Sequence, residues 1–294
     1  MKEIVILSGK GGTGKTTVAA SLAALASDAV IADADVDAAD LHIVLQPRTV
    51  EQHEFRSGHV AVIRQADCSG CGVCKRHCRF DAIKAVEQNH GQLTFAVDPS
   101  ECEGCGVCVR VCPNRSIDFP ERVNGEWYIS RTRFGWLVHA RLHPGAENSG
   151  KLVTQVRSVA RRLAQQQRAR LIITDGPPGI GCPAIAAISG ADVVLIVTEP
   201  TVSGAHDLER VLALARHFDV PAFVAVNKWD INPDNAALLE HRAAALGAQL
   251  LPRIPFDSAV VNALVNLQPV VQVGPSQAAE QIRRIWVELT KWLT

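Results

Sequence analysis

Residues 2–17 read KEIVILSGKGGTGKTT, and this stretch decides the fold. Its apolar first half is typical of a buried strand, and the following segment fits the pattern G-x-x-x-x-G-K-[ST] from Gly9 to Thr16. In this context, backbone N–H groups face phosphate oxygens, Lys15 reaches the outer phosphates and Thr16 binds Mg²⁺. The sequence therefore predicts a nucleoside triphosphate site formed by Gly9, Gly11, Gly12, Thr13, Gly14, Lys15, Thr16 and Thr17.

Short runs rich in Val and Ile recur along the chain, several of them separated by segments of helical length. This alternation predicts an α/β fold, a mostly parallel doubly wound sheet with helices on both faces. The expected strands are KEIVIL, AVIADAD, RLIITDG, ADVVLIVT and AFVAVNK, and the expected helices are 16–26, 203–217, 233–246, 258–267 and 276–293.

Acidic residues follow two of these strands. Asp33 and Asp35 lie at the end of AVIADAD, and Asp175 ends the apolar run LIITD. Ligands of open α/β sheets bind at the carboxyl ends of the strands, so these carboxylates are candidates for the phosphate site. Helix capping or a solvated loop is the alternative interpretation, above all for Asp37 and Asp40.

Eight of the nine cysteines form two runs of the pattern C-x₂-C-x₂-C-x₃-C, at 68–78 and 102–112. At this spacing three cysteines bind one cubane and the fourth reaches the other cluster. The runs predict two [4Fe–4S] clusters. Structural zinc competes with this interpretation, although its ligands are usually cysteine pairs far apart in sequence. The predicted ligand sets are Cys68, Cys71, Cys74 and Cys112 for one cluster, and Cys102, Cys105, Cys108 and Cys78 for the other.

The cysteine runs interrupt the α/β pattern, which resumes after them. We therefore expect a phosphate-binding domain in two parts, residues 1–58 and 122–294, and an inserted iron–sulfur domain at residues 59–121.

Composition narrows the range of partners. Lys and Arg number 30, as do Asp and Glu, so the balance gives no reason to expect nucleic acid. The chain shows no leader pattern or long apolar run, and we expect a cytoplasmic protein in which cysteines bind metal rather than form disulfides. The segment 277–294 is amphipathic. Packing on the sheet is favoured over a membrane anchor, so we do not expect membrane association.

Together these motifs resemble the deviant Walker A ATPases of the MinD and ParA superfamily, which include Mrp-type and nitrogenase iron protein-type ATPases. Lys10 matches the extra lysine of that group, and residues 66–118 resemble bacterial two-cluster ferredoxins. The resemblance implies a homodimer in which Lys10 reaches the partner's nucleotide. It also implies that Asp35 positions the attacking water, Asp175 holds Mg²⁺ through water, and Gly179 offers its N–H to the γ-phosphate.

The sequence identifies the base of the nucleotide less specifically than it identifies the phosphate site. NKWD, residues 227–230, resembles the guanine-reading motif of GTPases. In the deviant Walker A group, however, Asn227 would read adenine and the loop around Pro255 would pack on the base. ATP is favoured because the Lys10 signature is a longer match than a four-residue motif.

The resemblance implies an Mg-ATP-hydrolysing iron–sulfur protein with Lys10, Lys15, Asp35 and Asp175 as catalytic residues. We expect its dimer cycle to gate electron transfer to or from a partner protein. The alternative is an ATP-dependent carrier of iron–sulfur clusters or a metalloprotein maturation factor, for which Cys182, the ninth cysteine, is the only labile candidate.

Overall fold

The computed structural model describes residues 1–87, 93–146 and 149–293. The chain divides into two compact units. Unit 1 comprises Met1–His53, Glu126–Leu142 and Asn148–Thr294, and unit 2 comprises Glu54–Gly125 and His143–Glu147. Each unit has a hydrophobic core of its own.

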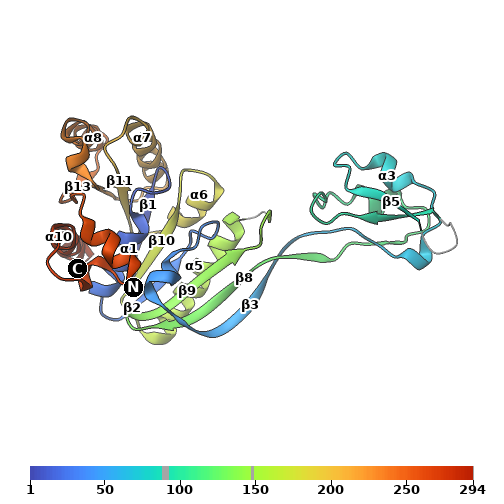
Figure 1. The fold of residues 1–294 in the computed structure, drawn as a ribbon, viewed down its shortest axis with the longest axis horizontal. Coiled ribbons are helices and arrows are strands. Elements are labelled where there is room, and N and C mark those ends of the chain that lie inside the picture. The colour runs from blue at the N-terminus through green and yellow to red at the C-terminus, as the bar shows by residue number, and fades with distance from the viewer. Residues whose placement is uncertain (88–92, 147–148, 294) are drawn as a thin grey trace. The chain divides into compact units, whose positions relative to one another are not determined.

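The described part of unit 1 is built on a sheet of nine strands, two of which, β3 and β8, continue into unit 2 (Figure 1). The sheet order is β13-β12-β11-β1-β10-β2-β9-β8-β3. Strands from β13 to β9 in this order pair in parallel, which confirms the parallel sheet expected from the Val- and Ile-rich runs. The strands are β1 (Lys2–Ser8), β2 (Ala29–Asp33), β3 (Arg48–His59), β8 (Glu121–Thr132), β9 (Gly135–Leu142), β10 (Leu171–Pro178), β11 (Val193–Thr198), β12 (Ala222–Val226) and β13 (Gln249–Leu250).

Helices cover both faces of this sheet. Four contribute to one buried cluster: α1 (Lys15–Leu25), α2 (Leu41–Leu45), α9 (Ser258–Val265) and α10 (Gln277–Leu293). The opposite face packs against α5 (Ser149–Gln167), α6 (Cys182–Ile188), α7 (Val202–His217) and α8 (Pro233–Ala245). The expected helices in 16–26, 203–217, 233–246, 258–267 and 276–293 are confirmed, with ends that differ by no more than two residues.

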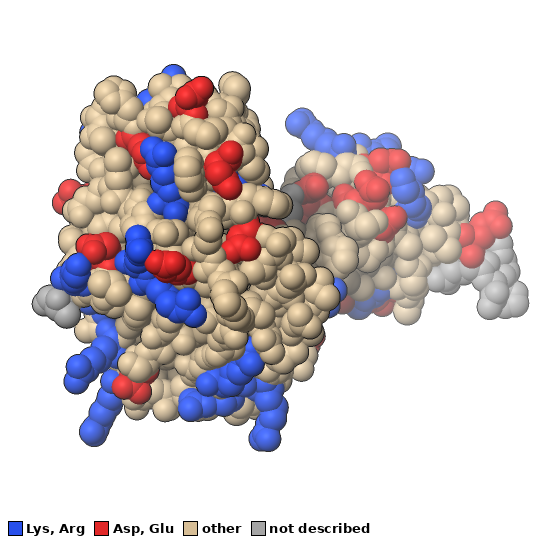
Figure 2. Space-filling view, turned by 60° about the vertical axis from the view of Figure 1, so that its left-hand side comes forward, with Lys and Arg blue, Asp and Glu red and all other residues tan. Residues whose placement is uncertain are grey.

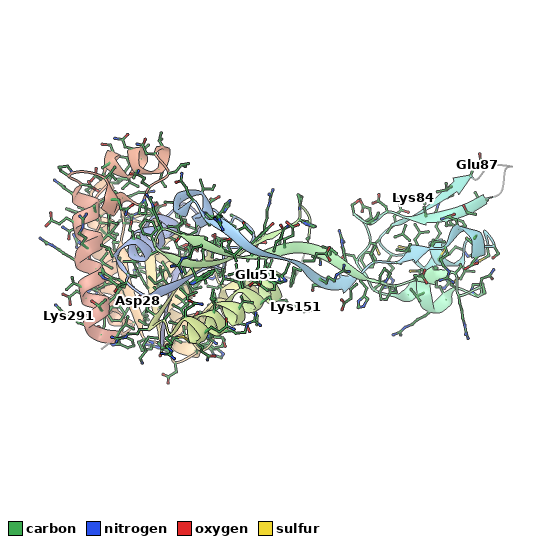
Figure 3. All side chains as sticks on the ribbon, turned by 90° about the horizontal axis from the view of Figure 1, so that it is seen from below. Asp28, Glu51, Lys84, Glu87, Lys151 and Lys291 are labelled. Atoms are coloured by element: carbon green, nitrogen blue, oxygen red, sulfur yellow. The ribbon has the colours of Figure 1, made fainter. Side chains whose placement is uncertain are left out.

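The amphipathic segment at the end of the chain packs inward, as expected. Ile282, Ile285 and Leu289 of α10 are buried in the cluster shared with α1. Lys291 lies on the exposed side of the helix (Figure 3). Among the described residues, none of the helices combines the length and apolar character that crossing a bilayer requires.

The surface carries both signs of charge. Figure 2 shows acidic and basic side chains interspersed on the visible face. This distribution agrees with the equal numbers of acidic and basic residues and gives no reason to propose a nucleic-acid site.

The described part of unit 2 contains two short antiparallel strand pairs, two single-turn α-helices and a 3-10 turn at Gln65–Asp67. Strand β4 (Val62–Ile63) pairs with β7 (Ile117–Asp118), and β5 (Ile83–Glu87) pairs with β6 (Leu93–Val97). Helices α3 (Val73–His77) and α4 (Val107–Val111) occupy equivalent places in the two cysteine runs and pack on each other. The buried core is small. It consists of Ala61, Ile63, Cys74, Ile83, Phe95 and Ile117, with Cys68, Cys78, Cys102, Cys108 and Cys112 packed against it.

A buried ionic network joins the first strand of unit 1 to the helices behind it. Glu3 on β1 accepts two hydrogen bonds from Arg157, at 2.8 Å each, and further bonds from Arg161 and the Thr174 hydroxyl. The guanidinium of Arg157 also donates to two carbonyl groups at the end of α6. Because Glu3 and Arg157 are almost fully buried, each compensates a charge that water cannot reach.

We expect Arg157→Met to lower the free energy of unfolding by about 3 kcal/mol, because it leaves the buried Glu3 carboxylate with a single, half-exposed guanidinium partner. The matched control is Arg242→Met, which removes an exposed pair with Glu209 and should change stability by about 0.5 kcal/mol or less. Urea unfolding followed by circular dichroism measures both. Equal losses in the two variants would contradict the importance of burial.

The burial of His139 on β9 should make the stability of the fold depend on pH. Burial, and to a smaller extent the neighbouring His42, lowers the pKa of His139 to about 4. The unfolded chain binds this proton near pH 6.5, so the folded state loses stability as the pH falls from about 6.5 to about 4. His139→Gln should remove up to about 3 kcal/mol of this loss. Urea unfolding across that window tests it, with exposed His206→Gln as the control. An unchanged pH dependence in His139→Gln would contradict the assignment.

Candidate functional site

The glycine-rich loop lies between β1 and α1, as the motif predicts, and Lys15 begins the helix. The Lys15 side chain is only 6% exposed. Its Nζ donates to Asp175 Oδ1 at 2.7 Å and to Asp35 Oδ2 at 3.2 Å. Three predicted residues, Lys15, Asp35 and Asp175, therefore meet at the carboxyl edge of the sheet. They come from α1, from the segment after β2 and from β10.

A third carboxylate makes this site strongly acidic. Asp33 is fully buried and accepts hydrogen bonds from the backbone N–H groups of Asp35 and Leu41, each at 3.2 Å. Burial, together with the charge of Asp175, raises the pKa of Asp33 well above its usual value. Burial also raises the pKa of Asp35, against the opposing charge of Lys15. Burial alone would lower the pKa of Lys15, but the charges of Asp175 and Asp35 outweigh it and raise that pKa.

Two polar atoms at this site fit a metal ion and a phosphate. Asp175 Oδ2 and the Thr13 hydroxyl are buried without a hydrogen-bond partner among the described residues. A buried carboxylate oxygen of Asp175, beside two further acidic side chains and one ammonium group, suits a divalent cation, because an unpaired buried carboxylate oxygen is costly. Thr16 lies partly exposed in the first turn of α1, close in sequence to both Thr13 and Lys15, where its hydroxyl is available as a ligand.

The other glycines expected to contact phosphate lie in the glycine-rich loop and directly after β10. Gly11 and Gly12 are exposed. The Gly179 N–H donates to the Ser8 carbonyl at 2.8 Å. A role of Gly179 at a γ-phosphate therefore requires that it exchange this bond.

A cavity of about 260 Å³ lies beside the loop and brings together the residues expected to bind the base. Asn227 donates through Nδ2 to the Thr13 carbonyl at 2.7 Å. The contact is tight: a Cβ at Gly14, whose φ is +92°, would lie 2.3 Å from that amide nitrogen. The lining includes Gly12, Gly14, Thr17, Asn227, Lys228, Ile254, Pro255, Phe256 and Val260.

The residue that would read guanine is engaged elsewhere. Asp230 accepts a hydrogen bond from the backbone N–H of Phe256 at 2.7 Å through its Oδ1 atom. It is not part of the cavity lining.

Lys10 pairs within its own chain. Its Nζ lies 2.6 Å from Glu199 Oε1, and it also donates to the hydroxyls of Thr201 and Ser203. Sequence reasoning did not find Glu199. The available signal was an acidic residue directly after the strand ADVVLIVT, at the same edge of the sheet as Asp35 and Asp175.

Cys182 lies outside the phosphate site. It begins α6 and is exposed, in a groove of about 870 Å³ between α5 and α6. Lys151, labelled in Figure 3, lines the start of this groove on α5. Neither the phosphate loop nor the base cavity includes Cys182.

The cysteines of unit 2 line two cavities. One is lined by Cys68, Cys71, Cys74 and Cys112, and the other by Cys78, Cys102, Cys105 and Cys108. All of these are free thiols. Burial raises the pKa of Cys74 and raises that of Cys108 to about 11. Among the described residues, no three His, Cys, Asp or Glu side chains are grouped closely enough to hold a single metal ion.

Comparison with known proteins places the nucleotide site in a family context. The family described as the CobQ/CobB/MinD/ParA nucleotide-binding domain matches residues 4–270. An uncharacterized protein of Methanocaldococcus jannaschii is 30% identical over 294 residues, which cover 99% of this chain and 97% of that protein.

Solved structures show the same fold. The cell division ATPase MinD of Pyrococcus furiosus superposes with a TM-score of 0.58 at 19% identity and covers 99% of both chains. The septum site-determining protein MinD of Pyrococcus horikoshii, solved in complex with Mg-ADP, also has a TM-score of 0.58 at 19% identity, and covers 99% of this chain and 96% of its own.

The unpartnered Asp175 oxygen predicts a magnesium dependence. In Asp175→Asn, we expect the tightening of ADP binding by Mg²⁺ to fall by about tenfold or more, since a charged acceptor is lost. Asp37→Asn, an exposed neighbour of Asp35, should keep the full effect. Calorimetric titration of ADP with and without Mg²⁺ compares them, and an undiminished Mg²⁺ effect in Asp175→Asn would refute this assignment.

Proposed function

The chain belongs to the CobQ/CobB/MinD/ParA nucleotide-binding family, and from this premise we propose that it is a Mg²⁺-dependent ATPase whose cycle gates electron transfer between two [4Fe–4S] clusters and a partner protein. The observation that carries the proposal is the presence, in one chain, of the Lys15 site and of two cavities that are each lined by four cysteines.

The ATPase half rests on the charge arrangement at Lys15. Phosphate oxygens entering the loop would replace Asp35 and Asp175 as acceptors for the Lys15 ammonium group. Asp35 would then be free to orient a water molecule toward the γ-phosphate, and Asp175 to hold the hydration shell of the metal. Mg²⁺ supplies positive charge for the phosphoryl group during transfer. Asn227 and Pro255 line the cavity in which adenine would bind, beside Gly12 and Gly14 of the loop.

The iron–sulfur half rests on how the cysteines are divided between the two cavities. Each lining contains three cysteines from one run and the fourth from the other, which is the division that the ferredoxin spacing requires. A cubane takes one thiolate on each iron, so four ligands spread around a cavity suit it although they would not surround a single ion. Bound there, the clusters would supply one-electron transfer.

A cluster carrier is less well supported. Five cysteines pack against the buried core of unit 2, and Cys74 belongs to that core. Ligands fixed in this way favour clusters that stay in place, whereas a carrier has to release them. We therefore propose a homodimeric ATPase with resident clusters, in which Lys10 contacts the nucleotide of the second copy and a separate protein donates or accepts electrons.

The cluster assignment predicts the iron content. Protein purified without oxygen should contain about eight iron and about eight sulfide ions per chain, as two cubanes require. Cys112→Ser should lose about half of both, because it removes a ligand of one cluster only. Chemical analysis of iron and sulfide, with zinc measured in parallel, provides the test.

Cys182→Ser is the matched control and should keep the full iron content. Two zinc ions and no sulfide in the native protein would contradict the proposal. Loss of iron in Cys182→Ser would instead favour a labile site and the carrier.

A further inference from the structure

One carboxylate joins the two sides of the nucleotide site. Glu199 stands directly after β11, and its Oε1 lies 2.6 Å from Lys10 Nζ. Its other oxygen, Oε2, lies 3.3 Å from Lys228 Nζ. Lys10 belongs to the phosphate loop, and Lys228 lines the base cavity next to Asn227. Glu199 therefore connects the loop for the phosphates with the loop for the base.

Three groups of its own chain bind the Lys10 ammonium group. An ammonium group has three hydrogens, and Lys10 has three acceptors: Glu199, Thr201 and Ser203. The Thr201 hydroxyl also accepts the Gly204 N–H as the cap of α7, so it is held in place. At the start of the loop, a Cβ on Gly9 would lie 2.2 Å from Asp207 Cβ, so the loop is pressed against α7.

Lys228 couples this arrangement to the loop that would bind phosphate. Besides Glu199, its Nζ donates to the Gly12 carbonyl at 3.1 Å. The preceding residue, Asn227, donates to the Thr13 carbonyl at 2.7 Å. A movement of Gly12 or Thr13 on nucleotide binding therefore acts on Lys228, which shares the carboxylate of Glu199 with Lys10.

If Lys10 left Glu199, the carboxylate would still be paired with Lys228. Partial burial alone would raise the pKa of Glu199, but its hydrogen bonds with Lys10 and Lys228 outweigh this and lower the pKa, so the group stays ionised. When Lys10 departs, Lys228 still neutralises the carboxylate. Since the Lys10 side chain is 31% exposed, its release costs about as much as breaking one partly solvated ion pair.

We propose that Glu199 is a positioning residue that holds Lys10 on its own chain and sets the nucleotide concentration at which two copies associate. The inference rests on the proposed function, because its output is the homodimer in which Lys10 contacts the second copy's nucleotide. In the dimer, phosphate oxygens replace Glu199 as the acceptor for Lys10, and Glu199 remains paired with Lys228.

The test is Glu199→Gln, which keeps the shape of the side chain and removes its charge. Sedimentation velocity of the full chain, titrated with Mg-ATPγS to prevent turnover, gives the concentration for half-maximal dimer. We expect this concentration to fall about fivefold, the effect of one partly exposed ion pair. Lys10→Gln alone should not associate at any concentration of Mg-ATPγS, because the group that contacts the second copy's nucleotide is gone.

Glu209→Gln is the matched control. It lies on α7, the helix that Thr201 caps, and the substitution removes an ion pair with Arg242 at 2.7 Å, away from the contacts of Lys10. Its dimerisation midpoint should equal that of the native chain. The affinity for ADP, measured by calorimetry, separates a specific effect from a folding defect: Glu199→Gln should shift dimerisation while ADP affinity stays within about twofold.

The outcomes are distinguishable. A native chain that associates with Mg-ATPγS, together with an unchanged or higher midpoint in Glu199→Gln, overturns the role of Glu199 and leaves the proposed ATPase intact. A native chain that binds nucleotide but never associates overturns both the restraint and the proposed dimer. Association of Lys10→Gln with the native midpoint also overturns it, since dimerisation would then not depend on Lys10.

Discussion

The ion pairs between Lys15 and the carboxylates of Asp35 and Asp175, with Asp33 buried beside them, are the interactions on which the rest of unit 1 depends. These side chains meet because β1, β2 and β10 are adjacent and parallel, so their carboxyl ends share one edge. One ammonium group faces three acidic side chains, and burial together with the charge of Asp175 raises the pKa of Asp33 well above its usual value. This gathering of acidic groups, together with the unpartnered Asp175 oxygen, makes the site suited to a divalent cation.

Sequence reasoning predicted the parts of the fold that depend on local pattern. The Val- and Ile-rich strands are buried on both faces, and the phosphate loop has a fixed spacing, so both could be recognised without knowledge of distant contacts. Strands β3, β8, β9 and β13 were not predicted. Most side chains of β3 are exposed, so burial leaves no clear periodicity along Arg48–His59. Glu199 was missed for a different reason: its partner Lys10 is far away in sequence and only the folded sheet brings them together.

Unit 2 poses the opposite problem, because its own core is too small to account for a stable fold. Six cysteines belong to that core or pack against it, and none forms a disulfide. Protonated thiols packed together contribute little beyond their apolar surface, whereas thiolates bound to a cluster tie distant parts of the chain together. Clusters bound in the two cavities, as we propose, would therefore give the unit a source of stability as well as a function. Residues 88–92, which join β5 and β6, lie outside the described part.

The central claim is that nucleotide chemistry in unit 1 acts on the redox groups proposed for unit 2. The most direct measurement is electron paramagnetic resonance of protein reduced with dithionite under anaerobic conditions, recorded with and without Mg-ATP. The account predicts signals from two interacting [4Fe–4S]⁺ centres that change on adding Mg-ATP in the native chain and do not change in a Lys15→Ala variant. Intact cluster signals that are indifferent to nucleotide in the native chain would contradict the coupling.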